Sequence, residues 1–195
     1  MAPLTVEDLL PLEVYAPRRR EFFDSHRRYI DRFRRVRIGP RLTLIFENRQ
    51  TLWFRVQEIV RVARLSDRRE VEQELDLYNR LLPDGRLLQA ALLLDVPDNS
   101  PNLHDWTDWR HLDGESLHLV LGDDELPARL VTCRPEDRCA GTAHWVQFAL
   151  DDHYRNLLED LDRPAFFRFA HGNYRHSSQP LDDDLRQSLL ADLDA

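Results

Sequence analysis

Glu58 and Arg61 are the two residues of this chain whose types and spacing best suit chemistry. They stand three residues apart in a stretch that is apolar on most sides when drawn as a helix, so their side chains can pair. A carboxylate in an apolar setting can transfer a proton, and a guanidinium can hold an anion through two hydrogen bonds. Because a buried charge is costly without a partner, both groups require other polar residues nearby.

Such partners are expected from three other places: a strand–helix junction at Asn48, the next helix, and the motif HGNY at residues 171–174. In one interpretation, Glu58 or His171 moves protons in a pocket that binds a small anionic or polar ligand through Arg61, Glu47, Arg49, Glu74, Asn79, Asn173 and Tyr174. In the other, the same residues form a structural network that holds two helices on a sheet. Whether the protein is an enzyme depends on which interpretation holds.

Two further clusters are weaker candidates. His104 and His111 stand seven residues apart among aspartates and tryptophans, a spacing that matches no metal-binding motif. Cys133, Cys139 and His144 lack a fourth ligand and the tight cysteine spacing of a structural zinc site. Neighbouring arginines could lower the pKa of the two thiols, but thiols without a role are favoured. With no glycine-rich phosphate loop either, the sequence predicts no metal and no cofactor.

The first long helix is expected over about residues 17–35. Pro17 suits its first position, where the missing amide hydrogen does no harm. Apolar and aromatic residues at helical spacing predict its buried stripe, namely Phe22, His26, Tyr29, Ile30 and Phe33.

Next come a hairpin and two more helices. A Gly-Pro pair separates strand candidates at 36–38 and 42–46. Asn48 can cap a helix over about 49–65, and another helix is expected over about 66–80.

After residue 85 the pattern changes to apolar runs of strand length. Candidate strands are 87–96, 117–121, 130–133, 144–150 and 166–170, with a short helix at 151–161. The fold class is therefore α+β: a helical N-terminal half packed on a mainly antiparallel β-sheet of four to six strands. Residues 1–180 are expected to form a single domain, and 181–195 an acidic C-terminal tail.

All 27 basic residues are arginine, and they are unevenly distributed. Residues 18–41 hold ten arginines and three acids, a local charge of +7, so the total of −8 leaves −15 for the rest of the chain. Such polarity can build an anion-binding face or attract a partner. Nucleic-acid binding is disfavoured because the acidic remainder repels phosphates.

The expected location is the cytoplasm. No apolar run approaches the ~20 residues that cross a bilayer, so no membrane contact is predicted. The N-terminal segment carries acids where a secretory signal has a basic region. Two cysteines fit reduced thiols.

Four motifs together resemble a bacterial family known as domain of unknown function 3501: FENRQT at 46–51, QEIVR at 57–61, ELDLYNRLLP at 74–83 and HGNY at 171–174. The resemblance covers about nine-tenths of the chain and implies no established activity. It implies a redox setting, since members are encoded near rubrerythrin-like and iron–sulfur oxidoreductase proteins. Members tend to have glutamate where this chain has Ala63, so any ligand or base at that position is missing here.

The favoured function is a non-catalytic accessory or binding protein, with a redox protein among the candidate partners. A homodimer is also predicted, because the helix at 17–35 has more aromatics than one stripe needs and Phe23 lies about 100° from Phe22. We expect this helix to supply apolar contacts and arginines that pair across a two-fold axis. Alternatively, Phe23 packs against residues 9–15 of its own chain.

Overall fold

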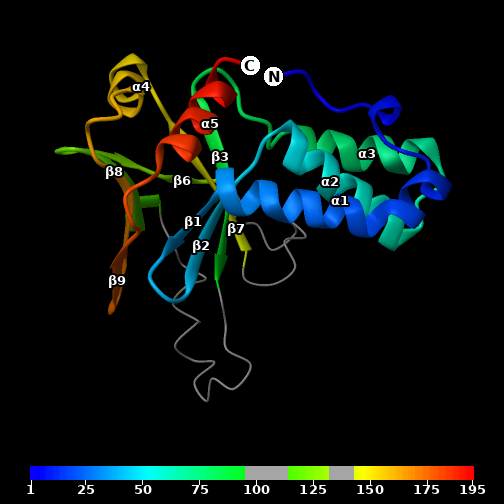
Figure 1. Ribbon diagram of the computed structural model, residues 1–195, viewed down its shortest axis with the longest axis horizontal. Coiled ribbons are helices and arrows are strands. Elements are labelled where there is room, and N and C mark those ends of the chain that lie inside the picture. Colours follow the sequence, from blue (N-terminus) through cyan, green and yellow to red (C-terminus); the bar gives the residue numbers. More distant parts are fainter. Residues whose placement is uncertain (95–113, 132–142) are drawn as a thin grey trace.

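The computed structural model describes residues 1–94, 114–131 and 143–195. In chain order the elements are η1 (Val6–Asp8), α1 (Leu12–Phe33), β1 (Arg35–Ile38), β2 (Leu42–Phe46), α2 (Arg49–Ala63), α3 (Arg68–Asn79), β3 (Leu87–Leu94), η4 (Gly114–Ser116), β4 (Leu117–Leu121), β5 (Asp124–Pro127), β6 (Arg129–Leu130), β7 (Ala143–Ala149), α4 (Asp152–Glu159), β8 (Ala165–His171), β9 (Tyr174–Ser177) and α5 (Asp183–Leu193). Helices α1, α2 and α3 lie on one side of two packed sheets, and α4 and α5 lie at one end of the sheets (Figure 1). The α+β class, with a helical N-terminal half and antiparallel strands, is confirmed.

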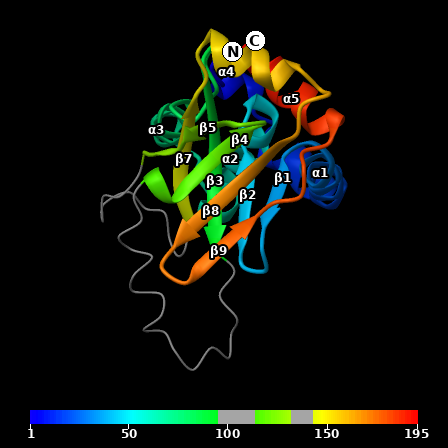
Figure 2. The same cartoon turned by 90° about the vertical axis from the view of Figure 1, so that its left-hand side faces the viewer.

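The strands form two sheets in place of the predicted single one. Sheet A has the order β1-β2-β3-β7-β6, and sheet B, in front in Figure 2, has the order β5-β4-β8-β9. The sheets meet at both sides, because β5 continues into β6 through Ala128 and because Ile38 of β1 bridges to Ser178 after β9. The two sheets therefore enclose one core in the manner of a flattened barrel.

Sheet A is buried on both faces. Toward sheet B, the rings of Phe46 and Phe148 lie 5.5 and 5.2 Å from the ring of Phe167, and all three side chains are buried. On its other face, Ala91 and Trp145 pack with an apolar cluster from α2 and α3. This burial explains why the sequence of β3 is an almost continuous apolar run.

The C-terminal segment belongs to the core, which corrects the prediction of an acidic tail at 181–195. Asp182 caps α5 by accepting a hydrogen bond from the backbone N–H of Leu185 at 2.8 Å. Acids at its start suit the positive end of the helix dipole. Three residues of α5 are buried among the side chains between the sheets: Leu185, Leu189 and Leu193. Residues 181–195 are acidic in composition, but they contain an amphipathic helix with buried leucines.

Helix α1 begins five residues earlier than predicted. Pro11 is its N-cap and Pro17 lies inside it, where the missing amide hydrogen leaves the Glu13 carbonyl without its usual helical partner. The predicted stripe faces α2: the Phe22 ring lies 5.6 Å from Trp53, and His26 stacks on Phe54 at 3.9 Å. No helix among the described residues is long and apolar enough to span a membrane.

Arg64 ends α2 in the left-handed conformation, with φ 53° and ψ 40°. This conformation costs a residue with a side chain about 1 kcal/mol, whereas glycine adopts it freely. Because Arg64 is exposed, Arg64→Gly is expected to raise the free energy of unfolding by about 0.5–1 kcal/mol in urea titrations. The control Gln73→Gly, at an exposed position inside α3, should lower it by about 1 kcal/mol. A lower free energy of unfolding in both variants would contradict the proposal that Arg64 is strained.

Candidate functional site

Glu58 lies between α1 and α2, where three side chains donate hydrogen bonds to its carboxylate. Arg61, one turn later in α2, donates Nε and Nη2 at 3.0 Å each, which confirms the predicted pair. Arg19 of α1 donates Nε and Nη2 at 2.8–3.0 Å. The hydroxyl of the fully buried Tyr15 donates at 2.8 Å. The cluster is a clamp that joins the two helices.

These donors fix the charge of Glu58. Partial burial alone would raise its pKa, but the hydrogen bonds from Arg61, Arg19 and Tyr15 outweigh burial and lower the pKa to about 2. A group that transfers protons efficiently needs a pKa near the working pH. At neutral pH, Glu58 is therefore an ionised acceptor held in place by two guanidiniums.

The low pKa of Glu58 makes the clamp sensitive to acid. Its folded-state pKa lies below the ordinary value of 4.5, so the ionised carboxylate stabilises the fold above pH 4.5 and loses this effect as pH falls through about 2. Glu58→Gln is expected to lower the free energy of unfolding by about 2 kcal/mol near pH 7 and by less than half as much near pH 3.

Urea titrations at the two pH values test this expectation. Glu21→Gln is the matched control, because Glu21 accepts hydrogen bonds from Arg18 on the exposed side of α1. Such a surface pair contributes little. An equal loss for Glu58→Gln at both pH values would assign the effect to packing.

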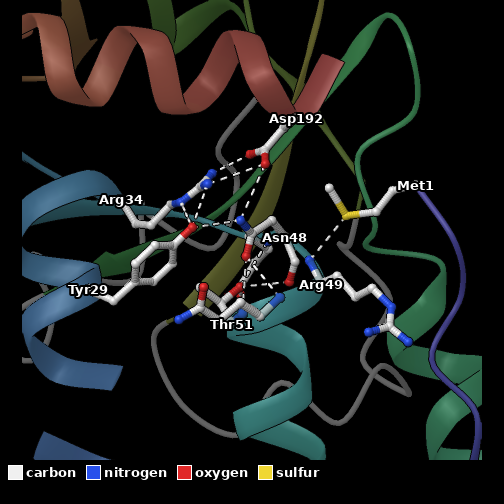
Figure 3. A network of polar contacts seen from close by, with 9 residues as sticks. Met1, Tyr29, Arg34, Asn48, Arg49, Thr51 and Asp192 are labelled. Carbon is white, nitrogen blue, oxygen red and sulfur yellow. Dashed lines mark hydrogen bonds and ion pairs between the residues drawn. The ribbon is translucent and has the colours of Figure 1, made fainter. Parts of the chain in front are cut away.

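A second polar cluster occupies the junction between β2 and α2 (Figure 3). The side-chain oxygen of Asn48 accepts the backbone N–H groups of Gln50 and Thr51 at 3.1 Å each, which confirms the predicted cap. Glu47 is buried, and its two oxygens accept from the Thr51 hydroxyl at 2.6 Å and from Arg55. Both carboxylate oxygens are thus satisfied inside the protein.

A buried ion pair between Arg34 and Asp192 ties this junction to α5 (Figure 3). Arg34 also donates to the Tyr29 hydroxyl at 3.0 and 2.7 Å, and the amide of Asn48 donates to the same hydroxyl at 2.9 Å. The Arg34 and Asp192 side chains are only 3% and 5% exposed. No local pattern in the sequence reveals this network, because Arg34 and Asp192 are 158 residues apart.

Two predicted ligand-binding residues hold the N-terminal segment instead. Arg49 pairs with Asp8 at 2.6 Å and donates Nε to the Ala2 carbonyl at 3.2 Å. The amide of Asn79 bonds both main-chain groups of Leu4. Glu74 is partly buried on α3 and forms no ion pair with another described residue.

Tyr174 and Asn173 belong to the β8–β9 hairpin of sheet B. The Tyr174 hydroxyl donates to the Ile38 carbonyl at 2.7 Å and accepts the Arg41 amide at 3.1 Å, so it fastens the β1–β2 hairpin to β9. Asn173 is exposed in the turn between β8 and β9. Gly39, at φ +64°, passes so close that an added Cβ would lie 2.5 Å from the His176 ring.

His171 ends β8, and its Nδ1 lies 3.3 Å from the Ser116 hydroxyl. Sheet A separates this end of sheet B from α2 (Figure 1). The prediction that His171 converges with Glu58 and Arg61 in one cleft is therefore wrong. The candidates form three separate groups: the clamp at Glu58, the β2–α2 junction with the N-terminal segment, and the HGNY hairpin.

The weaker clusters fall largely outside the described residues, namely His104, His111, Cys133 and Cys139. His144 lies on β7, where burial lowers its pKa. Within the described ranges, no group of three His, Cys, Asp or Glu residues is placed to hold a metal ion.

Much of the positive charge of residues 18–41 is neutralised within the chain. Arg19 pairs with Glu58, Arg32 with Asp184, and Arg34 with Asp192. These acids belong to the segments that carry the charge of −15. Part of the charge separation along the sequence is therefore cancelled by ion pairs within the folded chain.

Three side chains on the outer side of α1 are exposed to solvent: Arg20, Phe23 and Arg27. We call these residues the α1 outer face. Phe23 is 42% exposed, and its ring lies 6.3 Å from that of Phe54. Arg20 and Arg27 lie within about 60° of Phe23 around the helix. Arg20 pairs with no acid in the described part of the chain, and Arg27 approaches Asp31 only to 3.9 Å.

Comparisons with known proteins identify a solved structure of similar fold and the family of this chain. No curated protein matches the chain. A crystal structure at 1.90 Å resolution of a novel protein of unknown function from Burkholderia pseudomallei K96243 is similar, with a TM-score of 0.84 and 27% identity over 98% of this chain and 99% of that chain. The profile of the family described as "Protein of unknown function (DUF3501)" matches residues 3–193, from the N-terminal segment through α5. The chain therefore belongs to the DUF3501 family.

Proposed function

We propose that this protein is a non-catalytic cytoplasmic binding protein that docks an acidic protein partner on the α1 outer face. The observation that carries the proposal is the exposed Phe23 with Arg20 and Arg27 beside it. Aromatic residues and arginine are enriched in protein interfaces, where an apolar centre excludes water from surrounding charge pairs. Arginine also grips carboxylates with two hydrogen bonds.

A non-catalytic role is supported by the state of the acid–base candidates. Glu58 has a pKa of about 2 and is held by two arginines, and His171 lies in another layer of the fold. Both buried carboxylates of the junction, Glu47 and Asp192, have arginine partners. The family resemblance indicates which partners to try first: rubrerythrin-like and iron–sulfur oxidoreductase proteins.

Binding measurements with three forms of the protein test the proposal. Arg20→Glu/Arg27→Glu reverses the charge of the α1 outer face. Arg69→Glu/Arg80→Glu makes the same change at exposed arginines of α3 and its C-cap. A redox partner is expected to bind the wild type and the α3 variant equally, and the α1 variant about tenfold more weakly or less. Wild-type affinity should fall as salt rises. Equal binding by all three forms would contradict the proposal.

A second copy of the chain is the alternative occupant of this face, as in the predicted homodimer. Phe23 favours it, because its ring stays 42% exposed beside Phe54. Light scattering would then give the wild type twice the chain mass of 23.2 kDa and Arg20→Glu/Arg27→Glu the single mass.

A further inference from the structure

Residues 1–10, which we call the strap, are bound across α2 and α3 by side chains that contact their main chain. Gln57, fully buried, accepts the Leu10 amide at 2.8 Å and donates to the Leu10 carbonyl at 3.0 Å. Asn79 bonds the amide and carbonyl of Leu4 in the same way, at 2.8 and 2.9 Å. Trp53 donates its indole N–H to the Asp8 carbonyl at 2.9 Å. A neighbouring β-strand bonds the main-chain N–H and C=O groups of an added peptide in a similar way.

The same surface of α2 and α3, which we call the strap groove, also supplies an apolar pocket and charges. Leu4 is 3% exposed and packs in the cluster that contains Leu52, Val56, Val71 and Leu75. Toward the other end of the strap, Asp8 pairs with Arg49 at 2.6 Å and Glu7 with Arg68 at 2.8 Å. The groove thus has main-chain partners, an anchor pocket and cations that match the acids of the strap.

The strap is joined to α1 but is not bonded to it. Apart from hydrogen bonds within the strap, its hydrogen bonds and ion pairs in the described structure go to α2, α3 and the C-terminal residue Ala195, and none goes to α1. Pro11 alone separates Leu10, held by Gln57, from Leu12, the first residue of α1. The ring of Pro11 fixes its φ, but rotation about its Cα–C bond can move the strap while the Pro11 carbonyl keeps its hydrogen bonds from the Val14 and Tyr15 N–H groups of α1. The contacts with α2 and α3 that it gives up are available in identical form on another copy, and short hinges favour such exchange.

We propose that the strap groove is a peptide-binding site for the strap of a second copy, so that two protomers exchange residues 1–10. This inference is independent of the α1 outer face. Dimer formation by exchange depends on Leu4, Gln57 and Asn79, and charge reversal at Arg20 and Arg27 leaves it unchanged.

Two full-length variants test the exchange by complementation. Leu4→Asp has a defective strap and an intact groove, whereas Gln57→Ala/Asn79→Ala has an intact strap and a defective groove. In light scattering, we expect the wild type at twice 23.2 kDa and each variant alone at 23.2 kDa. An equimolar mixture should recover dimers, because the intact strap of one variant can fill the intact groove of the other.

Leu77→Asp is the matched control, since Leu77 of α3 is 51% exposed and makes none of the strap contacts; it should remain dimeric. Leu4→Ala keeps the strap but shrinks an anchor contact that is the same in the closed protomer and in the exchanged dimer. It should therefore lower the free energy of unfolding by about 2–5 kcal/mol and leave the dimer dissociation constant nearly unchanged, even if Leu4→Asp does not fold; a rise of about tenfold would contradict the exchange. A wild-type mass of 23.2 kDa at every concentration overturns the exchange. So does a dimer that persists in Leu4→Asp alone or in Gln57→Ala/Asn79→Ala alone.

Discussion

Arg186→Ala is expected to lower the free energy of unfolding by about 3–5 kcal/mol. The Arg186 side chain is 2% exposed and lies in α5. Its guanidinium donates hydrogen bonds at 2.7–3.4 Å to five main-chain carbonyls: those of Leu157, Leu158, Asp160, Leu161 and Arg163. Carbonyls in the last turn of a helix have no partner in their own helix. Alanine would remove these donors from the last turn of α4 and from the turn that follows it, where the Asp160 carbonyl would keep the backbone N–H of Arg163.

A lysine at the same position separates charge from geometry. Lysine keeps the positive charge, but its three donors radiate from one atom and cannot reach all five carbonyls. Arg186→Lys should therefore recover only part of the loss. Thermal unfolding should show a fall in Tm of about 10 °C for Arg186→Ala.

Arg155→Ala is the matched control, because Arg155 of α4 pairs at the surface with Glu159 and Asp194. A surface ion pair contributes little, so this variant should change Tm only slightly. Equal shifts for Arg155→Ala and Arg186→Ala would contradict the role assigned to the buried guanidinium.

Arg186 also shows where prediction from sequence ends. The helices at 49–65 and 66–80 and the hairpin before them follow from local signals: a capping residue, a repeat of 3.6 and a Gly-Pro pair. Arg186 instead binds carbonyls 23 to 29 residues away. Because composition alone predicts a tail at 181–195, the core helix that carries Arg186 is missed.

In the same way, the sequence pattern of a strand predicts where the strand lies better than it predicts how strands pair into sheets. Alternation and apolar runs indicate which residues face a core, but not with which strand each one pairs. Ala128 connects β5 of sheet B to β6 of sheet A. The strands therefore form two sheets and not the predicted single sheet. No residue type marks such a crossing.

The candidate site was predictable to the same extent. Glu58 and Arg61 pair because residues three apart on a helix are neighbours. Tyr15 and Arg19 join them only through the antiparallel packing of α1 on α2. The polar HGNY motif suggests that His171 joins them, but no physical rule of spacing connects His171 with Glu58 and Arg61. The motifs were enough to identify the family, whereas the contacts of Glu58 with other helices depend on tertiary packing.

The buried pair of Arg34 and Asp192 gives the second large expected effect. Arg34→Ala leaves the Asp192 carboxylate buried without its cation, which should lower the free energy of unfolding by about 3–5 kcal/mol near neutral pH. Arg32→Ala is the matched control two residues earlier, because Arg32 pairs with Asp184 where both side chains are more than half exposed. The control should have little effect.

The loss caused by Arg34→Ala should depend on pH, and its sign follows from Asp192. Burial raises the pKa of Asp192 above the ordinary value of 3.8, and Arg34 opposes this rise. Without Arg34 the pKa rises further, so the folded variant favours the protonated acid. The contribution of Asp192 to the stability of the variant is then greatest below pH 3.8 and is lost as pH rises through the folded-state pKa of Asp192. Urea titrations should therefore show a smaller loss in acid than at neutral pH.

Asp192→Asn in the Arg34→Ala background removes the unpaired charge while keeping a side chain of similar shape. It should restore part of the stability at neutral pH, because a neutral amide is less costly to bury than a carboxylate. A loss that is the same at all pH values and is not relieved by Asp192→Asn would assign the effect of Arg34→Ala to lost packing. The contact between α1 and α5 would then depend on apolar contacts around Tyr29 and not on the ion pair.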